Sequence, residues 1–348
     1  MKFPDVQGDG DTVYIGGSTG RSDDRTSRYV TSKFPFETPS DPQGEGNANG
    51  QSDYSPTVLA RGPDGWIYKV WMRSERGNRG IFIYRKPPNS DAWQGPFNVI
   101  APGNTFRVRV DVAVTATGNG GAGRIFVVWD ENSRYRFKFS DNRGESWSGT
   151  LLVSEDTTSS RPMLAADPGG GMWIAYSTAG EGDASGRVKA GVFEGDHFNV
   201  GDILAKGRNN YFSDPTISVR PNDGVVITAW RDVNGGIYYG ELQANSQWAT
   251  SRLVSGATAY GTVAVVSDPQ GNAHLMWAGD TSGQFDFWYA YKPYNQPWQG
   301  PVLATEDGDL DANVSVSTTV NGAYSYGHAV GERFTSNGLR TRYVLGRG

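Results

Sequence analysis

The chain has 348 residues, 37% of them hydrophobic and 12% aromatic, and a formal net charge of −5. Acidic and basic residues are interspersed without a basic stripe, which argues against nucleic acid as a partner, and no apolar run is long enough to insert into a membrane. The absence of cysteine excludes disulfides and thiolate metal sites. The 47 glycines and the aromatic content favour strands and tight turns over helices.

The first 53 residues show little regular pattern. Residues 12–16 (TVYIG) are expected to form one isolated strand. Residues 17–53 are rich in Gly, Ser, Asp, Asn and Pro with only small apolar islands, so they are expected to form a long polar excursion.

From Tyr54 onward the chain repeats. The marker is a glycine followed six residues later by an aromatic residue, and it occurs in five units: Gly65/Trp71, Gly123/Trp129, Gly170/Tyr176, Gly224/Trp230 and Gly271/Trp277. A sixth, degenerate unit has Gly322 and His328 at these positions. The spacing of roughly 50 residues is typical of propeller blades.

Each unit has an inner strand, the glycine turn, a strand that ends in the aromatic residue, and a third strand after a polar loop. A fourth strand follows an aromatic residue in five units, but the sixth unit reaches Gly348 without one. Because open sheets leave unpaired edges, residues 12–16 are expected to supply the missing strand near residues 340–345. The alternative is an open solenoid of sheets with two frayed ends.

The predicted fold is therefore all-β: a single six-bladed β-propeller of four-stranded antiparallel blades, closed by the N-terminal strand. The predicted blades cover residues 54–106, 107–159, 160–212, 213–260, 261–310, and 311–348 with 12–16.

One turn carries a family resemblance. Residues 140–147 (SDNRGESW) resemble an Asp-box, the Ser-x-Asp-x-Gly-x-Thr-Trp motif of sialidase-like β-propellers, with Asn142 in place of Asp and Ser146 in place of Thr. Gly144 can take positive φ in such a hairpin turn, and Trp147 can pack its ring between sheets. In that family the motif lies away from the active site, so we expect it to be structural.

The resemblance implies a carbohydrate-active or carbohydrate-binding protein that handles acidic glycans at its central pocket. An enzyme of this kind would be a glycoside hydrolase similar to exo-sialidases, located outside the cell or at the cell surface, although no signal peptide is present in this chain. No cofactor is expected to be required. The alternative is a non-catalytic structural or adhesion module of a larger surface or virion-type assembly.

Polar residues at one face of the ring are the candidate site, because loops that enter inner strands and leave second strands meet there. Paired carboxylates can cut a glycosidic bond, and the candidates are Asp130, Glu131 and Asp232. Arginines can hold a carboxylate bidentately and aromatic rings can stack on sugars. The candidate substrate-binding residues are Arg73, Arg161, Tyr211, Arg231, Tyr260, His328 and Arg333.

An acidic run lies between the fifth and sixth units. Oxygen ligands alternate there, at Asp307, Asp309, Asp311 and Asn313. This spacing resembles the start of a calcium loop, but it lacks the glycine at position six and the distal glutamate. A calcium site and a solvated acidic loop are both compatible with this sequence.

Overall fold

The protein is described by a computed structural model. It describes the chain outside residues 1, 10–11, 20–25, 34–42, 45–56, 74–78, 91, 106, 118, 158–159, 179–185, 205–212, 233, 255–258, 281–284, 306–309, 322–323, 336–337 and 348. In β1–β4, β26, β27 and most of β25, the backbone alone is described. None of the described residues belongs to a helix long and apolar enough to cross a membrane.

The described strands form seven antiparallel sheets, six with four strands and one with three. The first contains β1 (Lys2–Asp9), β2 (Thr12–Thr19), β3 (Thr26–Lys33) and β4 (Gln43–Gly44). The second contains β5 (Val58–Arg61), β6 (Ile67–Arg73), β7 (Arg79–Lys86) and β8 (Gln94–Gly103). The third contains β9 (Arg107–Val114), β10 (Ile125–Glu131), β11 (Arg134–Ser140) and β12 (Leu151–Leu152).

The fourth sheet contains β13 (Met163–Ala166), β14 (Met172–Thr178), β15 (Arg187–Glu194) and β16 (His197–Leu204). The fifth contains β17 (Ser213–Val219), β18 (Val226–Arg231), β19 (Ile237–Leu242) and β20 (Trp248–Val254). The sixth contains β21 (Ala259–Ser267), β22 (Ala273–Asp280), β23 (Phe285–Lys292) and β24 (Gln299–Leu303). The last contains β25 (Leu310–Asn321), β26 (Tyr324–Thr335) and β27 (Gly338–Arg347).

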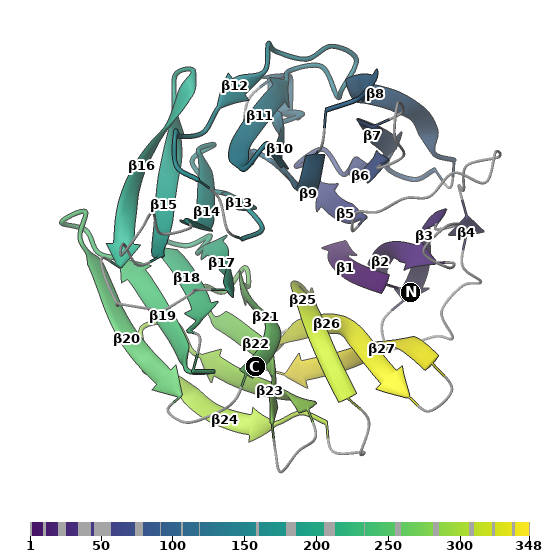
Figure 1. Cartoon of the computed structure of the whole chain (residues 1–348). Helices are drawn as coiled ribbons and strands as arrows, with labels where there is room; N and C mark the ends of the chain where they lie inside the picture. The colour runs from purple at the N-terminus through teal and green to yellow at the C-terminus, as the bar shows by residue number, and fades with distance from the viewer. Residues whose placement is uncertain are drawn as a thin grey trace.

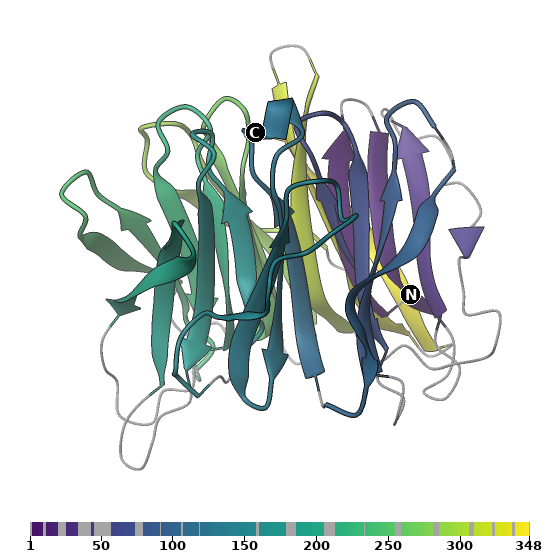
Figure 2. The same ribbon diagram turned by 90° about the horizontal axis from the view of Figure 1, so that it is seen from above.

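The sheets close into a ring around a central axis, as Figure 1 shows. The innermost strand of each sheet contacts the innermost strand of the next, from β5 through β9, β13, β17 and β21 to β25, and β1 contacts both β25 and β5. Figure 2 shows the same ring from above the view of Figure 1, with the strands of neighbouring sheets standing side by side. This closed ring is a β-propeller, so the predicted all-β architecture of four-stranded antiparallel sheets is confirmed.

The hydrophobic core lies between neighbouring sheets. Strand β10 is buried over six of its seven residues because both of its faces are covered, whereas β11 alternates buried and more exposed residues. One apolar cluster joins the second and third sheets and includes Val70, Ile83 and Trp129. Similar clusters join the third sheet to the fourth and the fifth to the sixth.

The glycine of the repeat marker is needed where the inner strand turns into the second. Gly123 has φ +74°, and a Cβ atom there would lie 2.3 Å from the Thr115 carbonyl oxygen. The short 3-10 turn η1 (Asn119–Gly121) precedes it. The positive φ and the close approach together explain why this turn carries glycine.

Two sequence predictions about the N-terminus are wrong. Residues 12–16 do not pair with the last sheet, because β2 pairs with β1 and β3, while β27 pairs with β26. Residues 17–53 are not only a polar excursion, since they contain β3 and β4. The ring therefore has seven sheets instead of six blades, and it closes by packing whole sheets face to face. Gly8, six residues before Tyr14, fits the repeat marker and could have revealed the additional unit.

Candidate functional site

One cavity lies on the axis of the ring, where the innermost strands face one another. It has a volume of about 320 Å³, and its wall is made by the innermost strands β5, β9, β13, β17, β21 and β25. Half of its lining residues are alanine or valine. Its charged side chains are Arg61, Asp111 and Arg161, and hydroxyl groups come from Thr216, Ser218, Thr262 and Ser315.

Most of these polar side chains connect one inner strand to the next. Oδ2 of Asp111 accepts a hydrogen bond of 2.7 Å from the backbone N–H of Leu164. The Ser218 hydroxyl oxygen accepts one of 2.8 Å from the N–H of Ser267, and the Thr262 hydroxyl donates one of 3.1 Å to the Val314 carbonyl. The polar part of the wall is therefore largely committed to holding the ring together.

Arg161 is the one predicted site residue on the wall of this cavity among those whose side chains are described. Its guanidinium lies 3.8 Å from Oδ1 of Asp111, and its side chain is 21% exposed. The cavity wall therefore has one carboxylate and one guanidinium that are close enough to contact the same small ligand.

The two predicted carboxylates at the end of β10 lie outside the central cavity. Asp130 is buried and lies 3.7 Å from Arg109. Glu131 accepts a hydrogen bond of 2.6 Å from Nε of Arg107 and forms an ion pair of 3.0 Å with Arg136. Both carboxylates therefore neutralise arginines of their own sheet in this structure, and their catalytic role stays a prediction.

The remaining described candidates also have partners, in their own sheet or in the adjacent one. Asp232 is buried and its Oδ1 accepts hydrogen bonds from the N–H groups of Asn234 (2.9 Å) and Gly236 (2.7 Å), which fixes the turn after β18. Arg231 donates to the Ala259 carbonyl at 2.8 Å. Arg73 lies over the ring of Phe82 at 5.0 Å. The cavity does not gather these three residues with Arg161.

Several predictions fall on parts of the chain that the structure does not describe. Tyr211, Asp307 and Asp309 lie outside the described residues. The others have a described backbone but no described side chain: Tyr260 in β21, Asp311 and Asn313 in β25, and His328 and Arg333 in β26. Among the side chains that are described, no three of the histidine or carboxylate type gather to hold a metal, so the calcium site stays a prediction.

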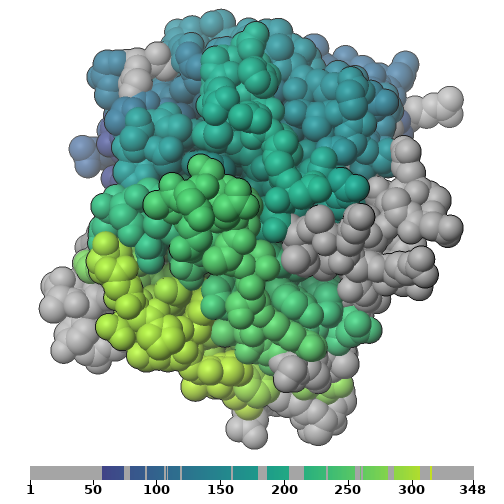
Figure 3. Space-filling model, turned by 90° about the vertical axis from the view of Figure 1, so that its left-hand side faces the viewer, coloured from purple at the N-terminus to yellow at the C-terminus, as the bar shows by residue number. Residues whose placement is uncertain are grey.

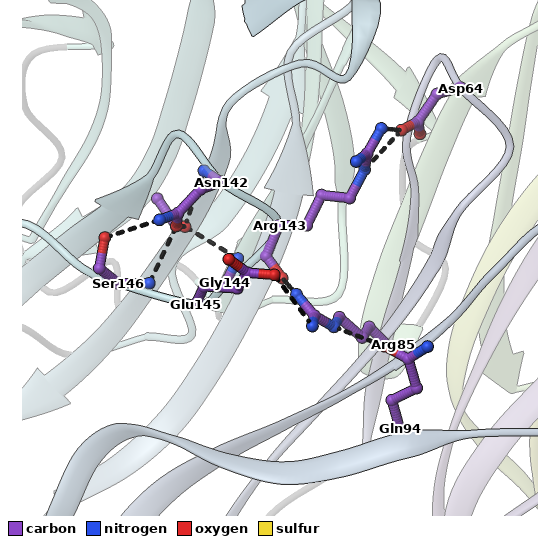
Figure 4. Close-up of polar contacts among 9 residues, drawn as sticks. Asp64, Arg85, Gln94, Asn142, Arg143, Gly144, Glu145 and Ser146 are labelled. Atoms are coloured by element: carbon purple, nitrogen blue, oxygen red, sulfur yellow. Dashed lines mark hydrogen bonds and ion pairs between the residues drawn. The ribbon is translucent and has the colours of Figure 1, made fainter.

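The turn at residues 140–147 is closed by its own side chains (Figure 4). The Ser140 hydroxyl oxygen accepts the N–H of Gly144 at 2.8 Å. Oδ1 of Asn142 accepts the N–H of Ser146 at 2.9 Å, and Nδ2 of Asn142 donates to the Ser146 hydroxyl at 2.9 Å. Asn142 thus does for this turn what an aspartate acceptor would do, and Trp147 packs against the cluster between the second and third sheets.

The same turn ties its sheet to the preceding one. Arg143 binds Asp64 of the second sheet through Nε and a terminal nitrogen, both at 3.0 Å. Arg85 of β7 donates to the Arg143 carbonyl at 2.9 Å and lies 3.3 Å from Glu145 (Figure 4). The turn therefore fastens two sheets together, which is a structural role.

A second cavity opens between the fifth and sixth sheets, on the outer side of the ring. It has a volume of about 330 Å³. It is lined by residues of β19 and β20, by Lys292 at the end of β23, and by Pro297 and Trp298 just before β24. The rings of Tyr239 and Trp298 lie 5.5 Å apart at an interplanar angle of 59°. We call this cavity the intersheet groove. Figure 3 views the ring from the side on which the green and yellow-green surfaces of these two sheets meet.

The groove combines these rings with charged and neutral polar groups. Nζ of Lys292 lies 3.4 Å from Oε1 of Glu241 and donates a hydrogen bond of 2.9 Å to the Gln296 carbonyl. The other polar lining residues are exposed: Gln243, Thr250, Ser251 and Arg252. Aromatic faces beside fixed polar groups are what a sugar ring needs, because its C–H faces pack on rings while its hydroxyls bond at the edges. The sequence analysis does not predict the groove; the one signal for it in the sequence is Trp298, an aromatic residue directly before an outer strand.

Comparisons with known proteins place the fold but not a family. No family model and no curated protein matches the sequence. The BP39L lectin from Burkholderia pseudomallei has a similar structure, with a TM-score of 0.71, 13% identity, and coverage of 98% of this chain and 94% of that one. The α-L-arabinanase from Penicillium chrysogenum has a TM-score of 0.55 at 13% identity, covering 83% of this chain and 91% of that one.

The fucose-specific lectin from Aleuria aurantia has a TM-score of 0.50 at 12% identity, with coverage of 83% of this chain and 94% of that one. These similarities to lectins and to an arabinan-degrading enzyme overturn the assignment to sialidase-like propellers, which is wrong. The physical reason is that residues 140–147 specify a hairpin turn that fastens two sheets, and such a local device can stabilise a propeller of any family.

Proposed function

We propose that this protein is a carbohydrate-binding propeller of the lectin type, and that it binds a sugar in the intersheet groove. The single observation that carries the proposal is the meeting of Tyr239 and Trp298 with the Glu241–Lys292 ion pair along one groove. The similarity to the BP39L lectin, which extends over 98% of this chain, supports a binding function. The sugar itself is not assigned by these observations.

The groove suits binding better than chemistry. Its carboxylate, Glu241, is 16% exposed and forms an ion pair with Lys292, whose side chain is 12% exposed. Glycoside hydrolysis in most families needs two carboxylates on opposite sides of one bond. Within the described chain, a single carboxylate lines the groove. A fixed ion pair can instead accept and donate hydrogen bonds to neighbouring sugar hydroxyls.

A hydrolase in the central cavity is the second candidate, favoured by the similarity to the arabinanase fold. Asp111 is the one carboxylate among the described residues of that cavity, and it is engaged by Leu164 and Arg161. A two-carboxylate mechanism would need a second acid there. Release of labelled sugar from arabinan oligosaccharides by the wild-type protein tests this candidate directly.

The binding proposal is tested by screening the protein on a glycan array and measuring the affinity of the best sugar by calorimetry. Trp298→Ala should weaken that affinity at least tenfold, because the indole ring against which the sugar ring would pack is lost. Trp248→Ala is the matched control, since Trp248 starts the outer strand of the neighbouring sheet but does not line the groove. Equal affinity of the two variants, or no binding to any glycan, would overturn the proposal.

A further inference from the structure

The positive charge of this protein is concentrated in two neighbouring sheets. Residues 58–152, which contain the second and third sheets, include 14 lysines and arginines against 8 aspartates and glutamates. The rest of the chain has 18 against 29. Along the sequence the acidic and basic residues are interspersed, but their numbers differ from sheet to sheet. Such an asymmetry focuses an attractive potential for anions on one side of the molecule.

Within these sheets the cations collect along β11. Arg134, Arg136 and Lys138 alternate with buried or partly buried residues, so they share one face of the sheet. Arg136 pairs with Trp129 and Lys138 with Val127 in the strand register. Trp129 and Val127 belong to the apolar cluster shared with the second sheet, so this cationic face is turned toward the second sheet.

The available carboxylates do not neutralise this face. Glu131 is shared by Arg107 at 2.6 Å and Arg136 at 3.0 Å, and Glu155 contacts Arg134. No ion pair is found for Lys138 in the described part of the chain. Burial lowers the pKa of Lys138 below its ordinary value, and the charge of Arg107 lowers it further. An anion placed beside Lys138 would counteract both effects, because an opposite charge favours the charged form of the lysine.

The outer strand of this sheet is shorter than the outer strands of the neighbouring sheets. Strand β12 has 2 residues, whereas β8, β16, β20 and β24 have 10, 8, 7 and 5. The Ser148 N–H bonds the Phe139 carbonyl, and Leu151 pairs with Phe137. Residues 149 and 150 therefore lie opposite Lys138 outside the ladder, and both are small and exposed.

We propose that the face of β11 formed by Arg136 and Lys138, together with Arg107, binds the carboxylate or sulfate groups of an acidic polysaccharide. This inference extends the proposed carbohydrate-binding function to a second, anion-selective surface on the other side of the ring from the intersheet groove. A polysaccharide fits better than a nucleic acid, because a duplex carries a charge about every 1.7 Å and would meet repulsion from the acidic remainder of the chain. The anionic groups of an acidic polysaccharide are farther apart, so they can be bound by the few cations of this face alone.

The test measures the binding of heparin, polygalacturonate and neutral dextran by calorimetry at three salt concentrations. We expect the two acidic polymers to bind and dextran not to bind. Arg136→Gln/Lys138→Gln should weaken acidic-polymer binding at least tenfold and make its dependence on salt shallower. Arg187→Gln is the matched control, because Arg187 is a 43% exposed arginine of the next sheet with its own partner, Asp202.

Glu131→Gln supplies a readout that a merely structural role would not produce. It removes the carboxylate shared by Arg107 and Arg136, so acidic-polymer binding should become several-fold tighter while the melting temperature falls or stays equal. Unchanged binding in both the Arg136/Lys138 variant and the Glu131 variant would overturn the proposal. Equal or tighter binding of a 20-base-pair DNA duplex would also overturn it, in favour of a nucleic-acid surface.

The two proposals fail separately. Trp298→Ala should leave the binding of acidic polymers unchanged, and Arg136→Gln/Lys138→Gln should leave the binding of the array-selected sugar to the groove unchanged. Loss of acidic-polymer binding in the Trp298 variant would place both ligands in the groove and overturn the second surface.

Discussion

The carboxylate of Asp111 bonds the backbone N–H of Leu164 at 2.7 Å, across the boundary between the third and fourth sheets. The same position two sheets later is Thr216, whose hydroxyl accepts the N–H of Val265 at 3.4 Å. An acceptor at this point of the inner strand satisfies a backbone donor that the neighbouring sheet would otherwise bury. The inner strands that line the central cavity therefore also join neighbouring sheets of the ring through these hydrogen bonds.

Asp111→Ala should lower the free energy of unfolding by about 1–3 kcal/mol, because the N–H of Leu164 would lose its partner in a buried position. Asp111→Asn should cost less, since an amide oxygen still accepts that hydrogen bond. Urea denaturation of the three proteins measures the difference. If the two variants lose the same free energy of unfolding, the charge of Asp111 beside Arg161 accounts for the effect, and not its hydrogen bond to Leu164.

The N-terminal sheet should be indispensable. Because β1 contacts both β25 and β5, a protein starting at residue 57 would expose the faces of two sheets and open the ring. We expect it to lose cooperative thermal unfolding or to aggregate, which scanning calorimetry and size-exclusion chromatography report. A truncated protein that stays monomeric and melts in one transition at the wild-type temperature would show that six sheets close without the first.

Trp147→Ala should destabilise the protein by about 3 kcal/mol, at the lower end for large core residues, because the ring is only partly buried against the cluster between two sheets. Trp147→Phe should recover most of the loss. Chemical denaturation and binding to the best array sugar are measured together. Unchanged stability with lost sugar binding would contradict the structural role of this turn.

Because of Asp156, the free energy of unfolding should depend on pH in the acidic range. Burial alone would raise the pKa of this carboxyl, but hydrogen bonds from Lys189, Ser154 and Tyr176 and the charge of Lys189 outweigh burial and hold the pKa below its ordinary value. Since the folded pKa is depressed, its stabilising contribution is present above the unfolded value of about 3.9 and is lost as the pH falls through the folded value.

The unfolding free energy of wild type minus that of Asp156→Asn should therefore be positive at pH 7 and shrink below about pH 4. Urea denaturation at pH 7, 4, 3 and 2 measures this difference. Gln247→Ala, a change at an exposed uncharged side chain in the turn between β19 and β20, controls for general acid effects. A difference that does not vary with pH would show that Asp156 is not stabilised by its charge.

The elements that neighbouring residues specify could be predicted from the sequence. Alternating residues in β11, the buried run of β10 and the glycine turn before it follow from periods and backbone conformations that neighbouring residues set. The turn at residues 140–147 belongs here too, because its hydrogen bonds run between residues two to four positions apart. These local rules predicted the repeat, the antiparallel sheets and the structural nature of that turn.

The number of sheets, the partners of residues 12–19 and the grouping of side chains into sites could not be predicted, because they depend on contacts between distant parts of the chain. Strands β1–β4 have weak apolar patterns, and their pairing depends on backbone hydrogen bonds between segments whose register no local rule fixes. Tyr239 and Trp298, or Arg107 and Arg136, come together through sheet packing. Of the predicted central site, Arg161 alone among the described side chains lines the central cavity, because partners in their own sheet or in the adjacent sheet hold the others elsewhere.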